Sequence, residues 1–317
     1  MKSGTMDGVL IIDKPAGLTS HDVVARVRRI LGERRVGHTG TLDPFATGVL
    51  IVLVGKATRL AQFLSGAIKE YEAAIRLGFA TDTGDMTGRP LTPVAEKTNP
   101  WRKEEFEAAL ASLRGEMEQV PPMYSAKKLG GKKLYELARR GEEVERKAVR
   151  VMIHSLELTG DSSDIFPQNT DGTTDIQVRV ACSAGTYVRT LAEDLGKRLG
   201  VGAHVAELRR TRAGGFALTD ANTLERLEEI VRNNAVDEVL VTPDIALEFL
   251  PCVSLNSLEV QRTHQGLPLK LESKSQQTFG ESDWVRMRDE FGSLVAVGMY
   301  DPGTDMVRPR VVLSLEQ

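Results

Sequence analysis

Apolar runs alternate with amphipathic segments along this chain, and each kind of segment predicts a structural element. Residues 8–15 begin with an apolar run that predicts a short buried strand ending at a Lys-Pro pair. Apolar side chains then recur at helical spacing, which predicts a helix with Thr19 or Ser20 as its cap and Gly32 at its end. Residues 48–55 are apolar almost throughout, as is typical of a strand buried on both faces.

Further strands and helices follow in an irregular order. The predicted strands are residues 71–78, 149–158 and 176–181, and the predicted helices are residues 100–113, 134–139, 190–199 and 224–231. Polar loops are expected over residues 37–44 and 81–88, and an exposed hairpin tip over residues 160–175. Because the chain has no regular strand-helix-strand repeat, an α+β fold with a mixed sheet is favoured over a doubly wound one.

The last part of the chain predicts a separate small β domain. Short strands divided by turn signals are expected at residues 253–255, 284–287, 294–300 and 311–313. Pro243 and Pro251 interrupt the preceding region, so the boundary is placed near Leu247. The sequence therefore predicts two domains, residues 1–246 and residues 247–317, in agreement with a length of 317 residues.

Composition narrows the class of protein. Hydrophobic residues make up 41% and charged residues 27%, which is ordinary for a globular protein. The longest strongly apolar run, residues 49–54, is far too short to cross a membrane. The first residues lack the apolar core and cleavage site of a signal peptide, so a cytoplasmic location is expected. Cys182 and Cys252 lie far apart in sequence, which suits isolated thiols better than a disulfide.

Charge is distributed unevenly, although the net charge is only −3. Residues 127–150 hold nine Lys or Arg against four Glu, a net charge of +5, and arginines also cluster at residues 26–35 and 209–212. Acidic residues concentrated between positions 225 and 248 offset this positive charge, so it does not appear in the net charge of the chain. Charge runs are most often solvated helix faces. The alternative is a surface that binds phosphate groups.

Three features resemble functional motifs but do not support the functions that those motifs usually indicate. The segment ending at Lys56 resembles a phosphate-binding loop, but it is too long and hydrophobic, and Ala57 replaces the Ser or Thr that binds Mg²⁺. A Ser-x-x-Lys string begins at Ser125 without the other strings of that acylating class. The five histidines are dispersed without a metal-ligand pair, so no metal site is predicted.

Asp43 is the strongest candidate for chemistry. It precedes a buried strand and has apolar neighbours such as Leu42 and Phe45, so its carboxylate is expected in a partly dry pocket where ionisation needs a partner. Arg189 lies between a predicted strand and a predicted helix, and its guanidinium can clamp a carboxylate bidentately and keep it anionic. The plainer alternatives are an Asp-Pro turn for Asp43 and a surface salt bridge for Arg189.

Five segments together carry a specific pattern. They are Asp13-Lys14-Pro15-Ala16-Gly17-Leu18-Thr19-Ser20, Gly37-His38-Thr39-Gly40-Thr41-Leu42-Asp43-Pro44, Pro121-Pro122-Met123-Tyr124-Ser125-Ala126-Lys127-Lys128, Gly185-Thr186-Tyr187-Val188-Arg189-Thr190 and Ala203-His204-Val205-Ala206-Glu207-Leu208-Arg209-Arg210. In this order they resemble the bacterial tRNA pseudouridine synthase B (TruB) family, over roughly residues 7–217. The C-terminal strands look like the small β domain, often of PUA type, that such synthases append.

The resemblance implies a fold, a reaction and a set of site residues. The implied fold is the pseudouridine synthase fold, an α+β arrangement with a central mixed, mostly antiparallel sheet, and the implied reaction converts uridine-55 of the tRNA T-loop to pseudouridine. Asp43 matches the catalytic carboxylate, Tyr71 the ring that stacks on the base and helps with the C5 proton, and Arg189 the partner of Asp43. His38, Tyr187, Leu208 and Asp85 match family positions at or near the substrate, and Lys14 is also expected to bind it. Lys132 and Lys133 are expected to bind the substrate because they belong to the basic segment of residues 127–150, which could hold the RNA backbone.

Elementary chemistry agrees with this reaction. Glycosidic hydrolysis typically uses two carboxylates, and these motifs hold no second acid beside Asp43. One ionised Asp can either attack C1′ or remove a C2′ proton, and the sequence leaves both routes open. A stacked uracil has to be flipped out at a cost of a few kcal/mol, partly recovered by stacking on an aromatic ring. No nucleotide, metal or redox cofactor is required.

Three functions remain open at this point: a tRNA-modifying isomerase, an RNA-binding or RNA-folding module without catalysis, and a glycosidase that excises the base. Intact Asp43, Tyr71 and Arg189 favour the isomerase. The expected partner is the T-stem-loop of tRNA, and no protein partner is implied. A monomer is expected because the sequence has no evident coiled-coil seam.

Overall fold

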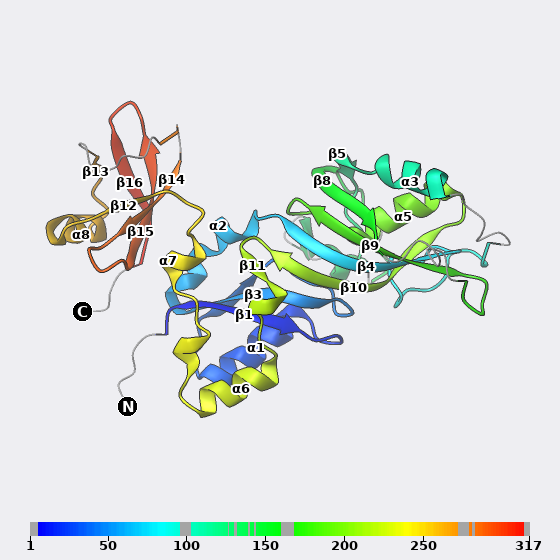
Figure 1. Cartoon of the computed structure of the whole chain (residues 1–317), viewed down its shortest axis with the longest axis horizontal. Coiled ribbons are helices and arrows are strands. Elements are labelled where there is room, and N and C mark those ends of the chain that lie inside the picture. The colour runs from blue at the N-terminus through cyan, green and yellow to red at the C-terminus, as the bar shows by residue number, and fades with distance from the viewer. Residues whose placement is uncertain are drawn as a thin grey trace.

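The computed structural model places two sheets at different ends of the molecule. It describes residues 6–95, 103–125, 127–129, 132–138, 140–142, 144–159, 168–271, 279–280 and 283–313. A large sheet with helices fills one part, and a smaller sheet near the C-terminus stands beside it, as Figure 1 shows. No helix in the described ranges combines the length and apolar character needed to span a membrane.

The large sheet is mixed and mostly antiparallel, as predicted. It contains β1 (Gly8–Lys14), β2 (Val36–Thr39), β3 (Thr47–Val54), β4 (Lys69–Leu77), β5 (Gly115–Gln119), β8 (Val149–Leu158), β9 (Thr174–Cys182), β10 (Ala203–Ala213) and β11 (Phe216–Ala217). The strand order is β1-β3-β10-β4-β9-β8-β5, with β2 paired to β3 and β11 paired to β10. Among the described pairings of this sheet, β10 runs parallel to β3 and the others are antiparallel.

The two strands β1 and β3 are buried on both faces, as their apolar sequences predict. Val9 and Ile11 face one hydrophobic cluster, whereas Leu10 and Ile12 face another. The second cluster includes the apolar side of α1 (Ser20–Leu31) and of α6 (Leu224–Arg232). Thr19 caps α1 by accepting a hydrogen bond from the Asp22 amide, and Gly32 ends it in the left-handed conformation.

Five further helices belong to the described part of the chain before the smaller sheet. They are α2 (Ala61–Ser65), which follows a 3₁₀ turn over Gly55–Leu60, α3 (Lys103–Ala111), α4 (Leu134–Ala138), α5 (Val188–Leu199) and α7 (Pro243–Ala246). Buried leucines of α3 and α5 pack on β4, β8, β9 and β10 in the largest hydrophobic cluster. Two short strands, β6 (Lys128–Leu129) and β7 (Lys132–Lys133), pair with each other. Two 3₁₀ turns flank α6, at Leu218–Asp220 and Val236–Glu238.

The smaller sheet has the strand order β12-β14-β15-β16-β13. Its strands are β12 (Cys252–Ser254), β13 (Leu269–Lys270), β14 (Trp284–Arg288), β15 (Leu294–Asp301) and β16 (Met306–Val312). The prediction of strands alone missed α8 (Ser257–His264), although Asn256 and Glu259 form the capping box that signals a helix start. Trp284 on β14 packs edge-on against Phe63 of α2, with ring centroids 5.0 Å apart.

Two predictions about local structure are corrected. The polar loop expected over residues 37–44 begins with strand β2, because residues 36–39 pair with β3 at the edge of the sheet. Helix α5 starts at Val188 rather than at Thr190, so Arg189 lies inside its first turn. The pairing of β8 with β9 is confirmed, but residues 160–167 of the expected hairpin tip lie outside the described residues.

Candidate active site

A cavity of about 300 Å³ opens where the loop between β2 and β3 meets β4, β10 and the start of α5. Five residues that the sequence analysis selected line it: Asp43, Tyr71, Tyr187, Arg189 and Leu208. They come from segments up to 165 positions apart, so tertiary folding brings them together. A cavity of this size is at the lower end of the range for small-molecule sites.

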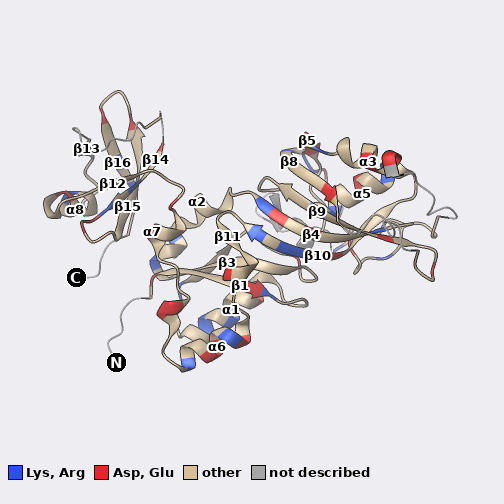
Figure 2. Ribbon diagram, viewed as in Figure 1, with Lys and Arg blue, Asp and Glu red and all other residues tan. Residues whose placement is uncertain are grey.

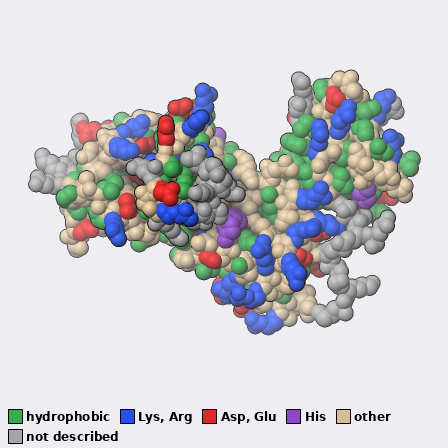
Figure 3. Space-filling model, turned by 180° about the vertical axis from the view of Figure 1, so that it is seen from behind, with side chains coloured by type: hydrophobic (Ala, Val, Ile, Leu, Met, Phe, Trp, Pro, Cys, Tyr) green, Lys and Arg blue, Asp and Glu red, His purple; other side chains and the backbone are tan. Residues whose placement is uncertain are grey.

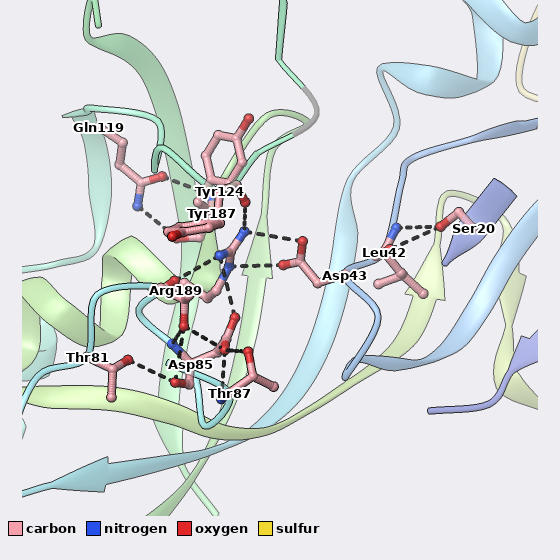
Figure 4. Close-up of polar contacts among 11 residues, drawn as sticks. Ser20, Leu42, Asp43, Thr81, Asp85, Thr87, Gln119, Tyr124, Tyr187 and Arg189 are labelled. Atoms are coloured by element: carbon pink, nitrogen blue, oxygen red, sulfur yellow. Dashed lines mark hydrogen bonds and ion pairs between the residues drawn. The ribbon is translucent and has the colours of Figure 1, made fainter. Parts of the chain in front are cut away.

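The loop that carries Asp43 is held by residues on both sides of it. The Ser20 hydroxyl, at the first position of α1, accepts a hydrogen bond from the Leu42 amide at 2.9 Å and donates to the Leu42 carbonyl at 3.1 Å (Figure 4). The buried Lys14 ammonium donates to the Pro44 carbonyl at 3.2 Å. These contacts place the Asp43 carboxylate in the cavity wall with a third of its side chain exposed, at 33%.

Arg189 is the centre of the polar network in Figure 4. Its guanidinium contacts both Asp43 oxygens, with Nε 2.9 Å from Oδ2 and Nη2 3.2 Å from Oδ1. It also donates to the carbonyl oxygens of Tyr124 at 2.7 Å and Thr83 at 2.8 Å. The Arg189 side chain is only 3% exposed, so the alternative of a surface salt bridge is wrong.

Asp85 holds the other side of the same guanidinium. Its Oδ2 lies 3.5 Å from Nη1 of Arg189, and its Oδ1 accepts hydrogen bonds from the Thr83 hydroxyl and from the Thr87 amide and hydroxyl. The carboxylate is buried behind Arg189 rather than in the cavity wall. Arg189 thus bridges a buried carboxylate and a partly exposed one, and Asp85 orients Arg189 instead of lining the cavity.

The start of α5 is positioned through Gln119. The Tyr187 amide donates to Oε1 of Gln119 at 3.0 Å, and Nε2 of Gln119 donates to the Tyr187 carbonyl at 3.4 Å (Figure 4). Tyr187 is the N-terminal cap residue of α5 and has no side-chain capping bond. The amide of Gln119 at the end of β5 therefore ties the helix start to the sheet and sets where Arg189 emerges.

Burial dominates the electrostatics of the site. It raises the pKa of the Asp43 carboxyl, with Asp85 acting in the same direction, whereas the positive charges of Arg189 and Lys14 oppose the shift. Burial also raises the pKa of the Tyr71 phenol, so its hydroxyl stays protonated at neutral pH. The bidentate contact with the Arg189 guanidinium therefore stabilises the ionised form of Asp43 at this partly buried position.

Two further predicted substrate-binding residues, His38 and Lys14, lie around the cavity rather than in its wall. His38, on β2, lies 3.2 Å from the hydroxyl of Thr41, a lining residue, and its ring meets that of His21 edge-on. Lys14 is fully buried, is not among the residues that line the cavity, and supports the Asp43 loop from behind. The backbone of Lys132 and Lys133 forms β7, but their side chains lie outside the described part of the structure.

Two buried cations, Arg210 and Lys69, also line the cavity, although neither was predicted to be a residue of this site. Arg210, 1% exposed, donates to the carbonyl oxygens of Val49 and Gly40, both at 2.7 Å. Lys69, 7% exposed, lies at the start of β4. Figure 2 shows basic residues on neighbouring stretches of β4 and β10. Strand alternation was the available signal, because it turns Arg210 inward while its neighbour Arg209 pairs with Asp13.

No group of three or more His, Cys, Asp or Glu side chains in the described residues is arranged to hold a metal ion. Cys182 and Cys252 are both free thiols.

Two protein-family models match adjacent segments that together cover residues 28–248. Residues 28–188 match the TruB family pseudouridylate synthase N-terminal domain, and residues 189–248 match the tRNA pseudouridylate synthase B C-terminal domain. Fold, cavity and matches together define a pseudouridine synthase, an isomerase that makes pseudouridine. The chain belongs to the TruB family.

Curated relatives are similar in sequence to this chain over most of its length. The tRNA pseudouridine synthase B of Geobacillus kaustophilus is 46% identical over 277 residues, which is 87% of this chain and 95% of the relative. The enzyme of the same name from Bacillus pumilus is 41% identical over 313 residues, which is 98% of this chain and 99% of the relative.

Solved structures extend the similarity to both sheets. A chain in an H/ACA ribonucleoprotein bound to a substrate RNA containing 2′-deoxyuridine has a TM-score of 0.74 at 25% identity, covering 98% of this chain and 86% of that one. A chain in the crystal structure of a Cbf5–Nop10–Gar1 complex has a TM-score of 0.72 at 28% identity, covering 99% and 85%. The pseudouridine synthase fold with a C-terminal β domain is thereby confirmed.

Proposed function

We propose that this protein isomerises uridine-55 in the T-loop of tRNA to pseudouridine, with Asp43 as the catalytic carboxylate. The observation that supports this most directly is the Asp43 carboxylate in the wall of the cavity, clamped bidentately by the buried Arg189 and sharing the cavity with Tyr71. The curated relatives are named as tRNA enzymes, and tRNA is the substrate that their family implies.

The reaction rearranges one nucleotide without net gain or loss of atoms. The C1′–N1 bond breaks and its electron pair stays on the uracil, the base turns, and a C1′–C5 bond forms. C5 then loses its proton and N1 gains one. Asp43 acts in the first step by one of two routes. If it attacks C1′, the bond between its carboxylate and C1′ breaks when C5 bonds to C1′; if it removes the C2′ proton, that proton returns to C2′ when C5 bonds to C1′. Arg189 keeps the carboxylate anionic for both routes. The ring of Tyr71 is the surface on which the flipped base stacks.

Two surfaces are proposed to hold the RNA outside the cavity. The first is the basic segment of residues 127–150 with Lys132 and Lys133, which would contact phosphates. The second is the lobe of α1, where Lys and Arg side chains gather in Figure 3 and where Arg28, Arg29, Arg34 and Arg35 are exposed. We further propose that residues 247–317 form a PUA-like RNA-binding domain beside the catalytic domain of residues 1–246.

The cluster at residues 209–212 is not such a surface. Arg209 pairs with Asp13, Arg210 is buried, and Arg212 pairs with Glu70.

Nucleoside analysis of a T-stem-loop RNA incubated with the protein tests the proposal. The wild-type protein is expected to form pseudouridine at the target uridine. Asp43→Asn keeps the side-chain shape but removes the anion, and it is expected to slow formation by on the order of 10³-fold or more while still binding the RNA. Asp13→Asn is the matched control, because Asp13 also pairs with an arginine, at 2.7 Å, but lies outside the cavity wall, and it should retain activity.

The same experiment separates the other two functions. Binding without any change in the nucleosides of the wild-type reaction would identify a non-catalytic RNA-binding module. Free uracil together with an abasic RNA would identify a glycosidase. Modification at the wild-type rate by Asp43→Asn would refute the role of Asp43.

A further inference from the structure

Lys69 and Arg210 place two positive charges in the cavity wall without a carboxylate to balance them. Their exposed fractions are 7% and 1%, and both belong to the lining. A Cβ at Gly40 would lie 3.5 Å from Cε of Lys69 and 3.4 Å from Nη1 of Arg210, so the two side chains approach the same point. Among the described residues neither cation has an ion-pair partner, whereas the Asp43 charge is already paired with Arg189.

Lys69 keeps one donor available toward the cavity. Its ammonium donates to the carbonyl oxygens of Ser65 at 2.8 Å and Ala67 at 2.7 Å, at the end of α2. An ammonium has three N–H donors, and no other hydrogen bond of Lys69 is made within the described residues. The third donor is therefore free for a ligand in the cavity.

Keeping such a charge buried is unfavourable without a ligand. Burial, together with the neighbouring positive charge of Arg210, lowers the pKa of Lys69 to about 8, so the charged form of Lys69 is disfavoured in the free protein. Buried charges in proteins are ordinarily paired or bound to a ligand. An unbalanced pair of cations beside an open cavity therefore indicates that an anion, or a group that becomes anionic, occupies this place during the reaction.

The strand geometry indicates which part of the nucleotide carries the negative charge that faces Lys69 and Arg210. Lys69 and Tyr71 are two residues apart on β4, so their side chains lie on the same face of the sheet, and Arg210 is the partner of Tyr71 in the β10–β4 register. A base stacked on Tyr71 would present its edge to the two cations. A phosphate is less suited, because the RNA backbone stays outside while Lys69 and Arg210 are almost completely buried.

We propose that the Lys69 ammonium, supported by Arg210, donates a hydrogen bond to a carbonyl oxygen of the detached uracil and stabilises its negative charge. This inference rests on the proposed isomerisation. When C1′–N1 breaks, the electron pair delocalises over N1 and the carbonyl oxygens of the uracil. The charge disappears when C5 bonds to C1′, C5 releases its proton and N1 takes one up. The same contact retains the detached base in the cavity while it turns, and it acts most strongly on the charged state.

Single-turnover kinetics with saturating T-stem-loop RNA test this role. Lys69→Met keeps the length of the side chain and removes its charge, and it is expected to slow pseudouridine formation by about 10- to 100-fold with the RNA dissociation constant changed less than about threefold. Lys69→Arg retains the charge and is expected to recover most of the rate. The control is Lys56→Met, because Lys56 is also a largely buried lysine, 14% exposed, but pairs with Asp7 away from the cavity.

The pH dependence of kcat/KM gives a readout that a structural role would not change. With a pKa of about 8, Lys69 loses its charge as pH rises through that value, so wild-type kcat/KM should fall on the alkaline side. The groups that face Lys69 are Cys182, Tyr71 and Arg210; the pKa of Cys182 is raised to about 11, and that of Tyr71 is also raised. Lys14 also has a pKa of about 8, so the diagnostic is the difference from Lys69→Arg, which should show a smaller fall.

Each alternative result contradicts the inference in its own way. A wild-type rate for folded Lys69→Met, with a lower melting temperature, would show that Lys69 only caps α2. Weaker binding with a smaller salt slope and an unchanged rate at saturation would show a phosphate contact. Identical alkaline limbs in the wild-type protein and Lys69→Arg would also contradict it. The proposed function fails separately, if wild-type protein makes no pseudouridine or if Asp43→Asn makes it at full rate.

Discussion

Arg189 in the active site and Arg286 in the smaller sheet are both buried arginines paired with a carboxylate, yet their surroundings differ. Nη1 of Arg286 on β14 lies 3.0 Å from Oδ2 of Asp244 on α7, and the guanidinium also donates to the Leu250 and Asp244 carbonyls at 3.0 and 3.1 Å. The exposed fractions of Arg286 and Asp244 are 9% and 13%. Asp43, the partner of Arg189, is 33% exposed and lies in a cavity wall.

The two ion pairs differ in how much of the carboxylate remains accessible. Around Arg286, the contacts join α7 to the smaller sheet across the predicted domain boundary, and little of the carboxylate remains open. Around Arg189, Asp85 and two backbone carbonyls hold the guanidinium from behind, so one partner of the pair can face a substrate. The same pairing therefore encloses its carboxylate at one place and leaves it accessible in a cavity at the other.

Removing the arginine from the active-site pair should have the largest effect. Arg189→Met leaves Asp85 as a buried charge without its partner and deprives Asp43 of the group that keeps it anionic. We expect pseudouridine formation to fall by on the order of 10³-fold and the free energy of unfolding by about 3–5 kcal/mol. Single-turnover rates and denaturant unfolding measure the two losses. Full activity in this variant would show that Asp43 does not need the guanidinium.

The corresponding change at the junction should separate stability from activity. Arg286→Met leaves the buried Asp244 without its close partner, and we expect the free energy of unfolding to fall by about 2–4 kcal/mol. The folded variant should modify a minimal T-stem-loop within about twofold of the wild-type rate, because Arg286 is remote from the cavity lining. Thermal unfolding and single-turnover kinetics on one preparation are the measurements. A large loss of rate in fully folded protein would show that the junction also acts on the site.

An exposed pair on the large sheet should give the smallest effect. Arg179 and Glu72 lie 3.3 Å apart on neighbouring strands, but their side chains are 55% and 50% exposed. Arg179→Ala is therefore expected to change the free energy of unfolding by less than about 0.5 kcal/mol and to leave the rate unchanged. Denaturant unfolding at low and high salt checks this. A cost comparable with that of Arg286→Met would mean that burial is not what distinguishes the three pairs.

The residues of the candidate active site show which contacts could be predicted from the sequence and which could not. The Asp43–Arg189 contact was predicted from an apolar setting and a nearby arginine, and the structure confirms it across 146 positions of the chain. Asp85 was expected near the substrate but lies behind Arg189, because the turn over residues 81–88 folds its carboxylate onto its own threonines. Lys14 was selected from its motif, whereas its burial and its bond to Pro44 follow from how β1 meets the Asp43 loop.

The features that could be predicted from the sequence are local: the continuous apolar runs of β1 and β3, the capped helix α1, the hairpin of β8 and β9, and the motifs that carry Asp43 and Arg189. These follow from hydrophobic pattern and capping, which neighbouring residues encode. Which charges are balanced depends instead on the three-dimensional fold. Whether Lys69 and Arg210 meet a carboxylate or an open cavity depends on the register of β4 and β10 and on the loop at Gly40, and both depend on contacts between distant segments.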